Sequence, residues 1–290
     1  MKKGDFIVKI LTSSRSNNST GHPAPLFLSI IFLTLLCLLN GCSTLSNGRR
    51  WGENATWKPG WTRIKDASID AALSPETWGP VAAALVLQID DMDEHISDWA
   101  SDNTPIFGSQ KNADRWSSYL RNASGATYLM TTLLTPGGED PLEWTTAKIK
   151  GLTVGAAASL VTSGATGFLK DQTERTRPDK SDKRSFPSGH ASSASSYTTL
   201  SRRNISCISM SPALRKTSNL ALYDISIGTA WARVEAKKHY PSDVLAGYAL
   251  GHFTSALIND AFLGLDTNKG PLLAVEPLHH GINVNLTWRY

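Results

Sequence analysis

The stretch from Lys170 to His190 constrains the fold most, because it places a charged loop between two helical segments. Residues 151–169 contain no charged residue and are rich in Gly, Ala, Ser and Thr, which predicts a close-packed central helix of an all-α domain. Lys170 and Arg177 are seven residues apart, or two helical turns, so we expect both cations on one helix face. Pro178 is expected to end this helix, because proline disfavours helical geometry in the residue before it.

A second helix is predicted to begin after the charged loop. Pro187, Ser188, Gly189 and His190 are followed by a run of small residues, a pattern typical of a helix N-terminus. Free backbone N–H groups and the helix dipole favour an anion at such a position. Two cations, an anion-binding helix start and a titratable imidazole therefore lie close in sequence, which indicates a phosphate site.

A second group of reactive side chains follows at Arg233, His239 and Asp243. Pro241 is typical of the first turn of a helix, so His239 should precede that helix and Asp243 should lie in its first turn. We expect the carboxylate to bond one imidazole nitrogen and fix the tautomer, which leaves the other nitrogen free to attack.

These three blocks resemble the signature of the type 2 phosphatidic acid phosphatase superfamily, which includes bacterial acid phosphatases and vanadium haloperoxidases. The signature reads Lys-x6-Arg-Pro, then Pro-Ser-Gly-His, then Ser-Arg-x5-His-x3-Asp, and here it covers about the central quarter of the chain. One position departs from it, since Ala232 replaces the serine of the third block. The resemblance implies an all-α fold, a compact helical bundle of the acid phosphatase/haloperoxidase type.

The resemblance also implies a role for each matching residue. His239 is expected to attack phosphorus and form a phosphohistidine, with Asp243 orienting it. His190 is expected to protonate the leaving oxygen and then to activate water. The groups expected to hold the non-reacting oxygens are Lys170, Arg177, Arg233, the Ser188 hydroxyl and the Gly189 backbone N–H. No cofactor and no metal are expected, because arginines supply the positive charge that a metal ion would give.

Three other functions remain compatible with these residues. The same site could hold vanadate and act as a haloperoxidase, because vanadate mimics a pentacoordinate phosphorus transition state. The chain could instead be a non-catalytic envelope lipoprotein with a vestigial site. A phosphate-binding module without turnover is the third, disfavoured by the pair of histidines.

Residues 1–41 are predicted to be a lipoprotein signal peptide. Basic residues precede an uncharged apolar run over residues 24–39, and small residues flank Cys42, which would carry the lipid. The alternative is an uncleaved membrane anchor. Ser43 follows the cysteine, and by resemblance to bacterial lipoproteins the destination is the outer membrane, facing the periplasm.

The composition of the remaining chain limits its partners. Without residues 1–41 it has 25 basic and 24 acidic residues, a net charge of +1, so a nucleic-acid partner has no support. The expected partners are a membrane, through the N-terminal lipid, and a phosphorylated lipid or small phosphomonoester as substrate. Cys207 is the one cysteine beyond the predicted lipid site, which leaves no intrachain disulfide.

The chain divides into four predicted parts: the signal peptide 1–41, a polar tether 42–60, a helical phosphatase domain 61–268 and a C-terminal hairpin 269–290. The hairpin prediction rests on strict alternation of apolar and polar residues after Gly281.

Within the helical domain, helices are expected over 61–72, from Pro80 into the acidic segment after it, over 111–134, from Pro141 to the site, from Pro212 to Trp231 and from Pro241 to Phe262. A polar connector is expected to begin at Ser201. The acidic cluster of residues 90–95 is interpreted as a solvated helix face, and His252 as a packed or surface histidine without a catalytic role.

Overall fold

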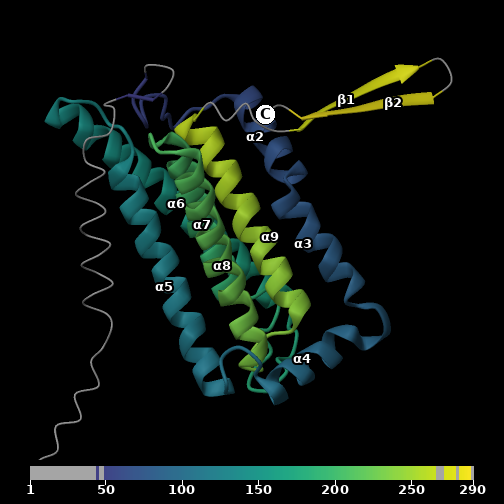
Figure 1. The fold of residues 1–290 in the computed structure, drawn as a ribbon. Helices are drawn as coiled ribbons and strands as arrows, with labels where there is room; N and C mark the ends of the chain where they lie inside the picture. The colour runs from purple at the N-terminus through teal and green to yellow at the C-terminus, as the bar shows by residue number, and fades with distance from the viewer. Residues whose placement is uncertain (1–43, 46–48, 266–270, 279–280, 289–290) are drawn as a thin grey trace, which may run out of the picture. The chain divides into compact units, whose positions relative to one another are not determined.

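The computed structural model describes residues 44–45, 49–265, 271–278 and 281–288. The predicted signal peptide and Cys42 lie outside these residues. The described domain is built of helices, which confirms the predicted all-α class (Figure 1). Its helical elements are α2 (Trp61–Leu73), α3 (Pro75–Val86), the short 3₁₀ helix η1 (Ile89–Asp91), α4 (Met92–Asn103), α5 (Gln110–Leu134), α6 (Pro141–Thr173), α7 (Gly189–Cys207), α8 (Pro212–Glu235), α9 (Pro241–Ile258) and the π-helical turn η2 (Asn259–Leu263).

Helix α7 is largely buried and packs against α5, α6, α8 and α9 (Figure 1). Its small side chains allow close approach of its neighbours. At Gly247 of α9, an added Cβ would lie 2.5 Å from the Ser188 carbonyl oxygen, and Gly251 is packed even more tightly against Ser192. The start of α7 is therefore held directly against α9 by glycine contacts.

Helix α6 is not the close-packed central helix that its composition predicts. It buries one stripe, including Val154, Ala158 and Thr162, and exposes Leu160 and Phe168 on another face. Among the residues that the structure describes, α6 is the one helix long and apolar enough to cross a membrane, judged by length and composition, and 28% of its most apolar window is buried.

The end of α6 also differs from the sequence prediction. The helix stops at Thr173, and Glu174 adopts a left-handed conformation with φ of 43°. Arg177 therefore lies in a loop, and neither the shared helix face of Lys170 and Arg177 nor the helix end at Pro178 is correct. Contacts from distant parts of the chain stabilise the loop, since Ser185 donates its backbone N–H to the Arg175 carbonyl.

Three other boundaries differ from the predictions. Pro80 lies inside α3, which begins at Pro75, and the helix is interrupted before α4 where Asp90 and Asp91 have positive φ. The residues from Ser201 to Cys207 continue α7 and are not a connector.

The segment predicted to be a tether is folded from residue 49 onward. Trp51 is buried against Val154 and Leu263, and its backbone N–H bonds the Pro136 carbonyl.

Helix starts follow the sequence closely. Ser188, Asp140 and Ser211 are the N-cap residues of α7, α6 and α8, and each accepts a backbone N–H with its side chain. Near the C-terminus, β1 (Pro271–Leu278) and β2 (Gly281–Trp288) pair antiparallel, with Pro271 opposite Trp288.

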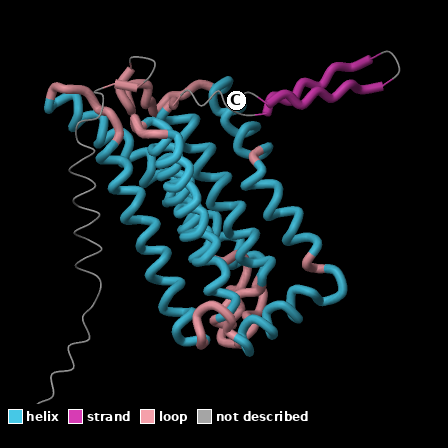
Figure 2. The backbone as a smooth tube through the Cα atoms, in the orientation of Figure 1, coloured by secondary structure: helices cyan, strands magenta, loops and turns pink. Residues whose placement is uncertain are grey.

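The loop between α6 and α7 and the loop between α8 and α9 gather at one end of the helices, beside α4 (Figure 2). The C-termini of α6 and α8 and the N-termini of α7 and α9 lie at this end. The side chains of the three sequence blocks are therefore brought to one place.

Candidate active site

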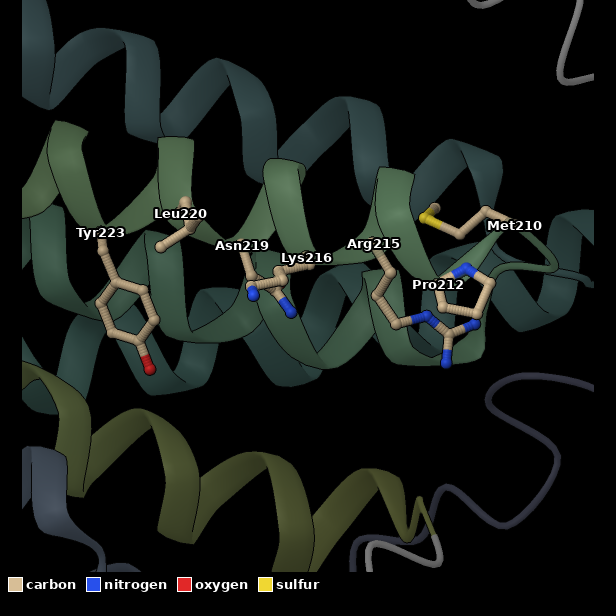
Figure 3. Close-up of a pocket in the computed structure, with 7 residues that line it drawn as sticks. All are labelled: Met210, Pro212, Arg215, Lys216, Asn219, Leu220 and Tyr223. Carbon is tan, nitrogen blue, oxygen red and sulfur yellow. The ribbon is translucent and has the colours of Figure 1, made fainter.

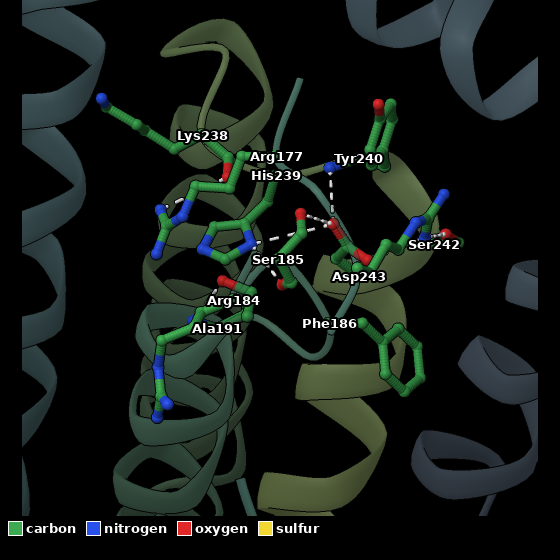
Figure 4. A network of polar contacts seen from close by, with 12 residues as sticks. Arg177, Arg184, Ser185, Phe186, Ala191, Lys238, His239, Tyr240, Ser242 and Asp243 are labelled. Carbon is green, nitrogen blue, oxygen red and sulfur yellow. Dashed lines mark hydrogen bonds and ion pairs between the residues drawn. The ribbon is translucent and has the colours of Figure 1, made fainter. Parts of the chain in front are cut away.

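Backbone contacts join the three sequence blocks (Figure 4). Ser188 donates its N–H to the Asp243 carbonyl at 2.9 Å, and His239 donates its N–H to the Arg233 carbonyl at 3.3 Å. A Cβ placed on Gly189 would lie 4.0 Å from Cε of Lys170. The end of α6, the start of α7 and the α8–α9 loop thus form one site.

His239 is buried, and its Nδ1 lies 2.7 Å from the carbonyl oxygen of Ser185 (Figure 4). A carbonyl can only accept a hydrogen bond, so Nδ1 carries the proton and Nε2 keeps its lone pair. The Asp243 carboxylate is 3.8 Å from Nδ1. This is the tautomer expected from the sequence, but Nδ1 donates its proton to a backbone carbonyl and not to the Asp243 carboxylate.

Asp243 is fully buried and contacts the α6–α7 loop through Ser185. Its carboxylate accepts hydrogen bonds from the Ser185 hydroxyl, the Tyr240 backbone N–H and the Arg175 guanidinium. Burial raises the pKa of the Asp243 carboxyl, but interactions with His239, Arg175 and Ser185 outweigh burial and hold the pKa below its usual value. Asp243 is therefore ionised at neutral pH.

Arg175 and Asp93 belong to this site and were not found from the sequence. Arg175 forms ion pairs with Asp243 at 2.8 Å and with Asp93 at 2.7 Å. Asp93 is 3% exposed, whereas Asp90, Asp91 and Glu94 are exposed. The interpretation of the acidic cluster as a solvated helix face is thus wrong for Asp93, since no local pattern reveals a partner 82 residues away.

His190 occupies the first turn of α7, and its Nε2 lies 3.3 Å from the Ser118 hydroxyl of α5. Burial, followed by the charges of Arg233 and Arg121, lowers the pKa of His190 to about 3. His190 is therefore neutral at neutral pH in the ligand-free site. Ser118 was also missed, because it lies in a helix far from the signature blocks.

The three predicted cations surround this arrangement. Lys170 Nζ donates to the Arg184 carbonyl at 2.6 Å, and burial, followed by the positive charge of Arg177, lowers the pKa of Lys170 to about 8. Arg177 Nε bonds Asp182 at 2.7 Å.

Arg233 is almost fully buried and pairs with Asp114 and Ser117 of α5. Its Nε atom is buried and has no hydrogen-bond partner within the described residues.

Ser188 and Gly189 form the helix start expected from the sequence. Ser188 is fully buried, and its hydroxyl accepts the Ala191 backbone N–H at 3.5 Å as the N-cap of α7. The N-terminus of α7 thus lies beside Lys170, where its dipole adds to the positive potential.

The electrostatics of the site favour a neutral nucleophile. Burial lowers the pKa of His239 to about 4, with Asp243 opposing this change and the charges of Arg233 and Lys170 adding to it. A neutral imidazole with a free Nε2, surrounded by cations, can attack an anionic electrophile such as a phosphoryl group.

Other polar clusters in the described residues do not reach this site. His252 is buried and bonds Thr199 and Ser74, as expected of a packed histidine. A pocket of about 480 Å³ lies along the first half of α8, between Met210 and Tyr223, and contains none of the predicted site residues (Figure 3). Across the described ranges, no group of three or more His, Cys, Asp or Glu residues could hold a metal ion.

Comparisons with known proteins give a family match and a structural match. Residues 151–263 match the family model described as the PAP2 superfamily, and this range contains all eight predicted site residues. No curated protein matches the chain. One solved structure that does match is described as the first transmembrane PAP2 type phosphatidylglycerolphosphate phosphatase from Bacillus subtilis. It is 19% identical, with a TM-score of 0.45, and the match covers 69% of this chain and 95% of that one.

Proposed function

We propose that this chain, whose residues 151–263 match the PAP2 superfamily model, is a phosphatase that hydrolyses phosphate monoesters or pyrophosphates through a phosphohistidine on His239. The observation that carries this proposal is the hydrogen bond from His239 Nδ1 to the Ser185 carbonyl. This hydrogen bond leaves Nε2 unprotonated, and the positive charges of Arg233 and Lys170 act on the same imidazole.

In the proposed first step, Nε2 of His239 attacks phosphorus while the bond to the leaving oxygen breaks. Lys170, Arg177 and Arg233 neutralise the non-reacting oxygens, assisted by the Ser188 hydroxyl and the Gly189 backbone N–H. Asp243 stabilises the imidazolium that forms, since its carboxylate is 3.8 Å from Nδ1.

His190 supplies the proton that the leaving oxygen requires. Its pKa is about 3 in the ligand-free site, so it must gain a proton as substrate binds. A phosphate dianion favours the protonated imidazole and raises this pKa. In the second step the neutral His190 takes a proton from water, which attacks the phosphohistidine and releases phosphate.

An exposed aromatic rim beside the site favours a lipid-linked substrate. The rim consists of Trp99, Ile106, Trp116 and Tyr119, each about half exposed or more. Trp116 also packs near Phe107, and the buried Glu235, two residues after Arg233, accepts the backbone N–H groups of residues 106 and 107 at 3.0 Å. Tryptophan and tyrosine at such a position suit the boundary between water and acyl chains.

We also propose that Cys42 carries lipid and tethers the domain to the outer membrane, facing the periplasm, after removal of residues 1–41. This rests on the N-terminal sequence. Incorporation of labelled palmitate that is lost in Cys42→Ser would support it, whereas labelling that persists in this variant would contradict it.

The function is tested by phosphate release from purified residues 43–290 in the absence of added metal. The substrates are p-nitrophenyl phosphate, detergent-dispersed phosphatidic acid and a prenyl pyrophosphate. His239→Asn keeps an amide donor for the Ser185 carbonyl but has no nucleophile, so we expect turnover to fall by at least about a thousandfold, as when a unit of covalent catalysis is removed.

His95→Asn is the matched control, because His95 is exposed on α4. We expect it to retain wild-type turnover, and we expect a higher kcat/KM for the lipid substrates than for p-nitrophenyl phosphate. If folded His239→Asn shows wild-type-like turnover, the proposed mechanism through His239 is wrong. A preference for p-nitrophenyl phosphate would remove the lipid assignment and leave a phosphatase of small phosphomonoesters.

A further inference from the structure

We propose that Arg175, held by Asp93 of α4, is a positioning residue that neutralises Asp243 and fixes the loop carrying the nucleophile, an inference that rests on the proposed function. Arg175 occupies an unspecified position between Lys170 and Arg177 of the first block, and Asp93 lies outside all three blocks. Asp93 lies outside the range that matches the family model.

The geometry places Arg175 between two buried carboxylates. Its Nη1 donates to Asp243 Oδ1 and to the Ser242 hydroxyl, both at 2.8 Å, while its Nη2 donates to Asp93 Oδ2 at 2.7 Å. The guanidinium lies 4.2 Å from the ring centroid of Tyr240. A planar fork with donors on both arms fits this bridge, and the single ammonium of a lysine does not.

Asp93 completes the connection to α9. Its Oδ1 accepts the Ser242 backbone N–H at 2.8 Å, and its Oδ2 also accepts the Ser242 hydroxyl. Asp93 thus binds the first turn of α9 directly and through Arg175. Helix α4 thereby fixes Ser242 directly and Asp243 through Arg175.

Arg175 acts on His239 through Ser185. The Arg175 carbonyl accepts the Ser185 backbone N–H at 2.9 Å, and the Ser185 hydroxyl donates to Asp243. The Ser185 carbonyl then accepts the His239 Nδ1 proton. Within the described residues, the hydrogen bonds and ion pairs of Arg175 lie on the Asp243 side of the imidazole, so its effect should be on kcat and not on phosphate affinity.

The charge of Arg175 also affects protonation of His239. Asp243 is the anion nearest to the imidazole and favours the imidazolium. The other charged or titratable groups that act on His239 are Lys170 of α6, His190 of α7 and Arg233 of α8. Arg177 of the loop acts on Lys170, and Asp93 of α4 acts on Arg175. Since Arg175 offsets the Asp243 charge, its removal should raise the pKa of His239, so that the imidazole is protonated at a higher pH.

Arg175→Gln removes the charge and keeps part of the hydrogen bonding. We expect kcat to fall at least about tenfold because the nucleophile loses its orientation, with KM changed less than about twofold. The acidic limb of the pH profile of kcat/KM should move up by about one unit. Arg175→Lys keeps the charge but not the bridge, so it should restore the limb while kcat stays low.

Arg203→Gln is the matched control, because Arg203 forms a comparable bidentate ion pair with Asp260 away from the site. We expect this variant to lose stability without any shift of the acidic limb. If Arg175→Gln loses stability and leaves the limb unchanged, its role is structural only and the proposal is overturned.

A second measurement does not depend on turnover. The pKa of the His239 imidazole is followed by NMR in the wild type, Arg175→Gln and Arg203→Gln, and we expect it to rise in Arg175→Gln alone. An unchanged pKa would overturn the inference even in an active enzyme. If the pKa of His239 rises in Arg175→Gln but the wild-type protein has no phosphatase activity, the electrostatic coupling is retained and the proposed function is refuted.

Discussion

At the scale of single residues, the site combines three cations of different character. An arginine guanidinium keeps its charge in proteins, whereas burial lowers the pKa of Lys170 to about 8. A lysine with a depressed pKa is protonated below that pH and loses its charge as the pH rises through it. Phosphate binding should therefore weaken on the alkaline side.

We predict that KM for a phosphomonoester rises between pH 8 and pH 9.5, by up to about tenfold per pH unit, because only the protonated Lys170 binds phosphate well. A phosphomonoester is already a dianion above pH 7, since its second pKa is about 6. Lys170→Arg should keep KM constant over this range. A flat wild-type profile, or the same rise in Lys170→Arg, would contradict this role of Lys170.

The residues that the sequence predicted are those that carry a local signature. Ser188, Gly189 and His190 form a helix start, and Pro241 marks the start of the helix that follows His239 and contains Asp243 in its first turn. Their positions could therefore be predicted from short patterns. Arg175 lies in the same charged loop, but its role depends on Asp93, whose burial no neighbouring residue indicates. The Ser185 carbonyl was not predictable either, because it is a backbone group of a loop.

At the scale of secondary-structure elements, the site depends on how closely α9 approaches the start of α7. Gly247 is in contact with the Ser188 backbone, which is the N-cap of the helix that carries His190. Any side chain at this position must displace the helix N-terminus from the phosphate site. This contact links packing to catalysis.

We predict that Gly247→Ala lowers the free energy of unfolding by about 1–3 kcal/mol, as overpacking does, and also lowers kcat. Gly164→Ala is the matched control, because an added Cβ there meets no atom within 4 Å and the helix propensity of alanine is higher. Urea unfolding and steady-state kinetics measure both effects. Equal stability and activity of the two variants would argue against the α7–α9 contact.

The starts of α6, α7 and α8 were predictable and the end of α6 was not, for a physical reason. N-caps such as Asp140 and Ser188 satisfy neighbouring backbone groups, so the signal lies within a few residues. The end of α6 depends on Glu174 adopting a left-handed conformation and on the contacts of the following loop with α4 and α9. The prediction of a helix through Arg177 was wrong because those partners are distant in sequence.

At the scale of the whole molecule, the site is assembled from more than the matched range. Residues 151–263 supply the eight predicted site residues, while α4 contributes Asp93 and α5 contributes Ser118 and Asp114. These earlier helices also carry the aromatic rim. The range that matches the family model therefore contains the residues proposed to carry the reaction, and we expect the segments before it to influence the choice of substrate.

The most direct test of the central claim is to trap the phosphorylated enzyme. The purified protein is mixed with ³²P-labelled substrate, quenched in base within milliseconds and analysed by peptide mapping. The account predicts an acid-labile, base-stable phosphoryl group on the peptide that contains His239, absent from His239→Asn. An active enzyme that yields no phosphohistidine, or a label on another residue, would contradict it.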